Sequence, residues 1–163
     1  MKWTSDKEPP APPSAEAVKG RALTLLTRRE HSRAELQSKL AEFGANSSQI
    51  ETVIAELVER KLQDDERFCE AFIRSRRQRG QGPISIGQEL RQRGIAADMS
   101  GPFLDEVDWR AEAASVRIRR FGAEAPVDRK AQARQLRFLQ YRGFTSAQAI
   151  AALKATDEEW AFD

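Results

Sequence analysis

The sequence predicts an all-α protein, built as an elongated tandem array of three three-helix repeats that resemble helix-turn-helix units. Three observations predict this class. Apolar residues recur at helical spacing, capping residues divide the pattern into short helices, and one pattern returns at an interval near 50 residues. Short helices cannot bury an apolar face alone, so the helices of each repeat must pack together.

The first repeat is expected over residues 15–62 and opens with a helix over 15–29. Val18, Ala22 and Leu25 recur in it at intervals of about one helical turn, which places them on one face. Two shorter helices follow, separated by tight turns. Gly44 supplies the left-handed residue that ends the first of them.

Helix starts are indicated by capping boxes, in which a Ser or Thr side chain and a Glu or Gln three residues later satisfy each other's backbone amides. The predicted boxes are Ser32 with Glu35, Ser48 with Glu51, and Thr145 with Gln148.

The pattern of an apolar residue, a second one four positions on and a glycine four positions later recurs along the chain. Residues 36–44 carry it, residues 86–94 repeat it 50 positions later, and residues 135–143 repeat it with Gln135 in the first apolar position. Each copy is preceded by a longer helix, expected over 65–79 and 109–121 for the later two. Three copies in the same order favour a repeat array over coincidence.

These patterns divide the chain into five segments. They are a disordered proline-rich arm (1–14), repeat one (15–62), repeat two (63–107), repeat three (108–157) and an acidic tail (158–163). We expect residues 80–83, Gly-Gln-Gly-Pro, to form a flexible joint within repeat two.

Composition restricts the class of protein further. Charged residues make up 32% of the chain, above the roughly 25% of an average domain, as a long shape with much solvated surface would require. Cys69 is the single cysteine, which favours a reducing compartment. The polar N-terminal residues do not resemble a secretory signal, and no apolar run could span a bilayer. A cytoplasmic protein without membrane contact is expected.

The net charge of +2 hides separate acidic and basic segments. Residues 42–70 have a balance of −5, residues 74–95 of +5 and residues 117–142 of +6. Some arginines only complement helix C-termini, but the four within 74–79 exceed that need. We predict a basic surface that binds a partner or DNA. It comprises Arg74, Arg76, Arg77, Arg79, Arg91, Arg93, Arg117, Arg120, Arg134, Arg137 and Arg142.

If this surface meets nucleic acid, its contacts should be mainly to phosphates. Asn and Gln side chains that could distinguish bases are few on the short helices. Most aromatic residues follow apolar faces and are expected in the core. They are Phe43, Phe68, Phe72, Phe103 and Trp109. Tyr141 and Phe144, beside Arg142, are the candidates for stacking on bases.

Catalytic and metal-binding patterns are not found in the sequence. His31 is the single histidine and precedes a predicted helix start, and Cys69 lies between apolar residues of a helix. The acidic run 64–66 also opens a helix, where acids stabilise the dipole. No glycine-rich phosphate loop is present. We therefore expect no enzyme, no metal and no cofactor.

Two segments carry a family resemblance. Residues 62–72, LQDDERFCEAF, resemble the opening of the second repeat in the RecX family, and residues 82–95, GPISIGQELRQRGI, resemble that family's glycine-proline to arginine-glycine-isoleucine motif. The first repeat is similar as well. The resemblance runs from about residue 16 to 155 and is weakest in the third repeat.

The resemblance implies a non-enzymatic regulator, expected to be a monomer. Such proteins bind RecA filaments on single-stranded DNA, and inhibit RecA ATPase, strand exchange, recombination and SOS activity. Family members also bind DNA alone, so double-stranded DNA is a further candidate partner. Two alternatives remain: a sequence-nonspecific or transcriptional DNA-binding protein of helix-turn-helix-like repeats, and a helical adaptor for acidic proteins.

Overall fold

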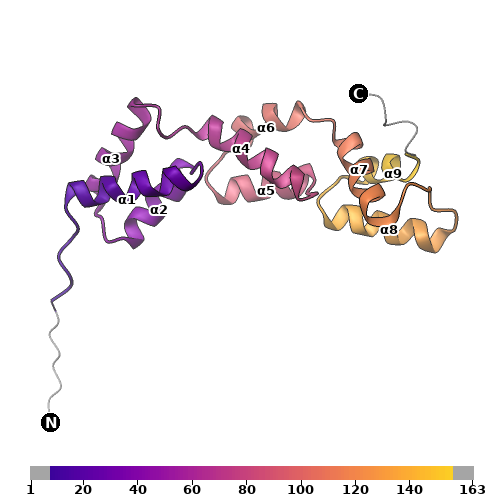
Figure 1. The fold of residues 1–163 in the computed structure, drawn as a ribbon, viewed down its shortest axis with the longest axis horizontal. Coiled ribbons are helices and arrows are strands. Elements are labelled where there is room, and N and C mark those ends of the chain that lie inside the picture. The colour runs from indigo at the N-terminus through magenta and orange to yellow at the C-terminus, as the bar shows by residue number, and fades with distance from the viewer. Residues whose placement is uncertain (1–7, 156–163) are drawn as a thin grey trace, which may run out of the picture. The chain divides into compact units, whose positions relative to one another are not determined.

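The computed structural model describes residues 8–155, and in that range it contains nine α-helices and no strand (Figure 1). The helices are α1 (Ala15–Arg28), α2 (Arg33–Glu42), α3 (Ser47–Glu59), α4 (Asp65–Gln78), α5 (Pro83–Gln92), α6 (Ala97–Asp105), α7 (Trp109–Phe121), α8 (Arg129–Tyr141) and α9 (Ser146–Leu153). The predicted all-α class with three helices per repeat is confirmed. Residues 1–7 of the predicted arm and the predicted acidic tail (158–163) lie outside the described residues.

The starts of the short helices follow from their capping residues. The Ser32 hydroxyl accepts a hydrogen bond from the Glu35 amide at 3.1 Å, and Thr145 accepts one from the Gln148 amide at 3.2 Å, so both predicted boxes are confirmed. Each box supplies hydrogen-bond acceptors to backbone amides that have no partner within the helix.

The predicted box at Ser48 is wrong. Helix α3 begins at Ser47, and Asn46 caps it: the Asn46 side chain accepts from the Gln49 amide at 2.9 Å, and the Gln49 side chain accepts from the Asn46 amide at 3.1 Å. Asn46 is the residue in extended backbone before the helix, so its side chain, and not that of Ser48, reaches the first amides.

Glycines end the second helix of each repeat. Gly44, Gly94 and Gly143 have φ values of +102°, +79° and +96° and follow α2, α5 and α8. The left-handed backbone favours glycine at each position because a Cβ would be strained there. The repetition seen in the sequence therefore corresponds to a repeated turn.

The chain forms two compact units, divided between Asp64 and Asp65. In the first unit, α1, α2 and α3 enclose a core that includes Leu36, Leu40 and Ile54, all fully buried. The carbonyl of Pro13 accepts a hydrogen bond from the Gln49 side chain at 2.7 Å, so the inner end of the proline-rich segment contacts this repeat. Phe43 does not belong to the core as predicted, because 42% of it is exposed where α2 ends.

The second unit contains repeats two and three around one shared core. Buried residues of repeat two, such as Phe68 and Leu90, belong to the same cluster as Leu139 and Phe144 of repeat three. Gln135 occupies the apolar position of the pattern and is buried with them. Because apolar side chains of both repeats are buried in one cluster, the hydrophobic effect holds the two repeats together.

Two glycine turns join repeats two and three. The Gly82 amide donates to the Arg142 carbonyl at 2.8 Å, and the Ile84 amide donates to the Gly143 carbonyl at 3.0 Å. A Cβ on Gly82 would lie 2.4 Å from the Gly143 carbonyl carbon. The expectation of a flexible joint at residues 80–83 is therefore wrong, since glycine at position 82 permits close backbone contact and hydrogen bonds hold it.

Candidate nucleic-acid and partner interface

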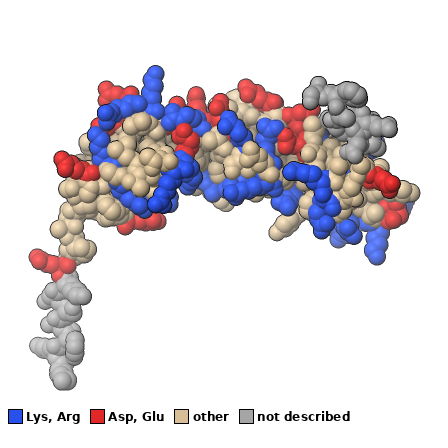
Figure 2. Space-filling view, viewed as in Figure 1, with Lys and Arg blue, Asp and Glu red and all other residues tan. Residues whose placement is uncertain are grey.

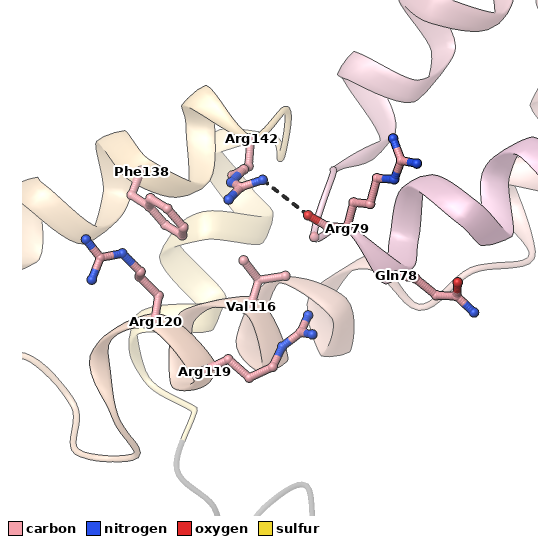
Figure 3. A pocket seen from close by; sticks show the side chains of 8 residues that line it. Gln78, Arg79, Val116, Arg119, Arg120, Phe138 and Arg142 are labelled. Carbon is pink, nitrogen blue, oxygen red and sulfur yellow. Dashed lines mark hydrogen bonds between the residues drawn. The ribbon is translucent and has the colours of Figure 1, made fainter.

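Three adjoining hollows lie over α4, α6, α7 and α8 in the second unit. The joint pocket, about 230 Å³, is lined by Gln78, Arg79, Gly80, Val116, Arg119, Arg120, Phe138 and Arg142 (Figure 3). The central hollow is lined by Arg74, Arg77, Gln78, Glu112, Ser115 and Arg119. The outer hollow is lined by Glu70, Ile73, Arg74, Arg77, Phe103, Glu106 and Val107. Because neighbouring hollows share two residues each, we treat the three together as one arginine trough.

The α4 arginines reach the trough because of their spacing. Arg74 and Arg77 are three residues apart, so their side chains leave the helix on one side. Arg74 is exposed. The Arg77 Nε donates to Glu112 of α7 at 3.1 Å, and a second guanidinium nitrogen of Arg77 also pairs with that carboxylate. One of the two cations is thus neutralised by repeat three.

Arginines on the α5 side of repeat two surround a single carboxylate. Glu89 accepts from Arg76 at 3.0 Å and lies 3.6 Å from Arg93. Both guanidinium groups also lie over the Phe72 ring, 4.3 Å and 4.7 Å from its centre. This group lies outside the lining of the trough, and its charge is partly offset by Glu89. Arg91, also on α5, is exposed.

Arginines of repeat three lie against aromatic rings. Arg120 approaches the rings of Phe121 and Phe138, at 5.3 Å and 6.0 Å from their centres, and Arg142 lies 5.4 Å from that of Phe138. The two rings contact each other edge to face at 5.2 Å. Arg134 lies over Phe121 at 5.3 Å. Cation–π contact of this kind holds a guanidinium in place without cancelling its charge.

Arg117 is not part of an exposed surface, so this part of the prediction is wrong. The side chain is fully buried. It donates to the carbonyls of Gly122, Glu124 and Ala155, at 3.3, 3.1 and 2.6 Å. Arg117 follows Ala113 by four residues and therefore lies on the same, buried face of α7. This spacing can be read from the sequence, but the prediction followed the charge of the segment instead.

The trough unites only part of the predicted surface. Arg74, Arg77, Arg79, Arg120 and Arg142 line it. Arg76, Arg91, Arg93, Arg134 and Arg137 do not. Arg119 is absent from the prediction but lines two of the three hollows. It follows Glu112 by seven residues, so both lie on one face of α7, and this spacing could have identified Arg119 as part of the surface. Figure 2 shows Lys and Arg side chains over both units on the face drawn.

The two aromatic candidates for base stacking differ in exposure. Tyr141 is 89% exposed, whereas Phe144 is 1% exposed. Phe144 packs edge to face on Trp109 with ring centres 6.5 Å apart. Phe144 is therefore a core residue, and the suggestion that it stacks on bases is wrong.

Groups with catalytic potential are enclosed. The His31 Nδ1 lies 3.0 Å from the Arg29 carbonyl, and burial lowers the pKa of its ring. Burial raises the pKa of the Cys69 thiol to about 11, so the thiol is protonated at neutral pH. Within residues 8–155, no group of three or more His, Cys, Asp or Glu side chains is placed to hold a metal ion. No helix in that range is long and apolar enough to cross a membrane.

Comparison with known proteins identifies all three repeats. Family models for the first, second and third three-helix domains of RecX match residues 19–57, 64–99 and 108–153. The regulatory protein RecX of Halorhodospira halophila is 51% identical over 148 residues, covering 90% of this chain and 92% of that protein. The regulatory protein RecX of Pseudomonas putida strain GB-1 is 44% identical over 130 residues, covering 78% of this chain and 83% of that protein.

Solved structures share the fold. The crystal structure of RecX from Lactobacillus salivarius superposes with a TM-score of 0.73 at 18% identity, covering 91% of this chain and 97% of that one. A second crystal structure, of a regulatory protein RecX, gives a TM-score of 0.67 at 21% identity, covering 82% of this chain and 70% of that one. The helical repeats, their order and the similarity over nearly the whole chain lead to one conclusion: this chain belongs to the RecX family of regulatory proteins.

Proposed function

We propose that this protein binds RecA filaments on single-stranded DNA and inhibits RecA ATPase and strand exchange, thereby limiting recombination and the SOS response. It acts as a cytoplasmic, monomeric regulator without a cofactor, and not as an enzyme. The observation that carries this proposal is the match of three consecutive RecX domains between residues 19 and 153.

The arginine trough supports the proposal in physical terms. It continues across two repeats that share one core, so the helices that carry its arginines are held together. Arginine forms forked contacts with both carboxylate and phosphate. A filament of protein on DNA presents both kinds of anion, and a surface of this type can contact them together.

RecA's DNA-dependent ATPase, measured with substoichiometric amounts of the full chain, tests the proposal. We expect the steady-state rate to fall. An unchanged rate at stoichiometric protein would contradict the proposal.

A paired variant tests the part played by repeat two. Arg74 and Arg91 are exposed, whereas Arg77 and Arg93 contact carboxylates, so reversing them would also place like charges together. We therefore expect Arg74→Glu with Arg91→Glu to weaken inhibition about tenfold. Arg110→Glu with Arg129→Glu is the matched control, because both are exposed and neither belongs to the predicted basic surface. Equal loss in both variants would show a general charge effect.

Binding to DNA alone is the second candidate function, including double-stranded DNA. It is favoured by the joint pocket, in which four arginines and no carboxylate form the lining. Inhibition that disappears when single-stranded DNA is in large excess would indicate simple competition for the strand. Inhibition that persists would indicate contact with the filament.

A further inference from the structure

The joint pocket differs from the rest of the trough in its charge. Arg79, Arg119, Arg120 and Arg142 line it, and no acidic side chain does (Figure 3). Carboxylates belong to both other hollows: Glu112 to the central one, and Glu70 and Glu106 to the outer one. The largest uncompensated positive charge of the trough is therefore at the joint between repeats two and three.

Helix dipoles account for only part of this charge. The four arginines lie at or near the C-terminal ends of α4, α7 and α8. Each such end carries about half a negative charge, so three ends offset about one and a half of the positive charges. Roughly two and a half charges remain. A single carboxylate would neutralise one, whereas two adjacent phosphodiester groups would neutralise about two.

Two of the four guanidinium groups, those of Arg120 and Arg142, are positioned before any ligand arrives. Arg142 donates to the Arg79 carbonyl at 3.2 Å, and both Arg120 and Arg142 lie against the Phe138 ring. Holding these side chains in place lowers the entropy lost when an anion binds. Because arginines already contact Phe138, that ring is poorly available for stacking on a base. The pocket is thus suited to bind phosphate and not to distinguish bases.

We propose that the joint pocket binds two adjacent phosphodiester groups of a single DNA strand, without reading the bases. A single strand is favoured over a duplex because its flexible backbone can bend into a hollow. This assignment rests on the proposed function, which places the protein on single-stranded DNA. It adds which arginines contact that DNA.

Fluorescence anisotropy of a labelled oligothymidylate, titrated with the full chain over a series of salt concentrations, tests this proposal without RecA. The pocket variant is Arg79→Gln with Arg119→Gln, since both residues are exposed and removing them spares the core. The matched control is Arg110→Gln with Arg129→Gln, which removes the same charge from exposed positions outside the trough.

Two lost phosphate contacts should lower the slope of log affinity against log salt by about 1.4, at about 0.7 per phosphate of a single strand. At about 0.1 M salt this corresponds to an affinity roughly 25-fold weaker, if the two proteins bind equally near 1 M. The control should stay within about twofold, and the wild-type protein should bind single strands of different sequence equally well.

Equal slopes for the pocket variant and the control would overturn the assignment. So would displacement of the oligonucleotide by polyglutamate of equal charge, which would identify an acidic protein segment as the occupant, or tighter binding of a duplex than of a single strand. A normal salt response without RecA inhibition would contradict the proposed function alone. Inhibition with equal slopes would contradict the pocket assignment alone.

Discussion

Repeat two and repeat three both carry many arginines, but the two repeats surround them with different chemistry. On repeat two, Glu89 lies between Arg76 and Arg93, and Arg77 contacts Glu112 from repeat three. On repeat three, Arg120 and Arg142 lie against aromatic rings. The first arrangement cancels charge, and the second preserves it.

The comparison shows that the number of arginines in a segment does not measure its capacity to bind anions. The sequence segments 74–95 and 117–142 have similar balances of +5 and +6. The available charge differs because carboxylates from the same repeat or the next one approach some guanidinium groups and leave others exposed. The difference can be tested by changing the partner of an arginine.

The largest expected effect comes from the buried arginine of repeat three. Arg117→Met should lower the free energy of unfolding of the second unit by about 3–5 kcal/mol, because it removes the donor to the buried Ala155 carbonyl and to the partly buried carbonyls of residues 122–124. Arg117→Lys should recover little, since an ammonium group lacks the fork of a guanidinium. Urea denaturation followed by circular dichroism measures the loss.

Arg119→Met is the control for Arg117. It changes an exposed residue of the same helix and should alter stability by about 0.5 kcal/mol or less. A similar loss in both variants would mean that burial does not distinguish the two arginines.

The joint between the repeats should give the next largest effect. Gly82→Ala places a Cβ against the Gly143 backbone, so the two turns must separate. We expect a loss of about 1–3 kcal/mol, as for other forced overpacking, together with weaker DNA binding as the pocket opens. Thermal unfolding and the anisotropy assay would detect both changes.

Gly20→Ala provides the contrast for the joint glycine. Gly20 lies inside α1, and a Cβ there meets nothing within 4 Å. The free energy of unfolding of this variant should rise by about 0.5–1 kcal/mol, since alanine restricts the unfolded chain more than glycine does. If Gly82→Ala were equally stable, the close backbone contact at the joint would be contradicted.

The smallest effect should come from removing the carboxylate of repeat two. Glu89→Gln removes the negative charge that Arg76 and Arg93 both approach, so oligonucleotide affinity should rise a few-fold and its salt slope should steepen by up to about 0.7 per added phosphate contact. Glu42→Gln, on the exposed surface of α2, is the control with the same charge change. Identical affinities for the two variants would show that Glu89 does not limit the charge of repeat two.

The sequence alone determined the helices and their repetition. Spacing of apolar residues, the Ser32 and Thr145 caps and the glycines at 44, 94 and 143 act within a few residues of the chain, so local chemistry decides them. The position of basic segments was also predictable. The cap of α3 was misassigned because Asn46 and Ser48 are both residue types that cap helices, and the backbone conformation decides that Asn46 is the cap.

Only the tertiary structure decided which arginines are available. Periodicity shows which residues share a helix face, but it does not show which element that face meets. Arg117 bonds to Ala155, 38 residues away, and Arg77 reaches Glu112, 35 residues away. The joint pocket likewise exists only because the Gly82 turn packs on the Gly143 turn. Contacts between distant segments set the burial and the partner of each guanidinium, and these determine the charge that a ligand can meet.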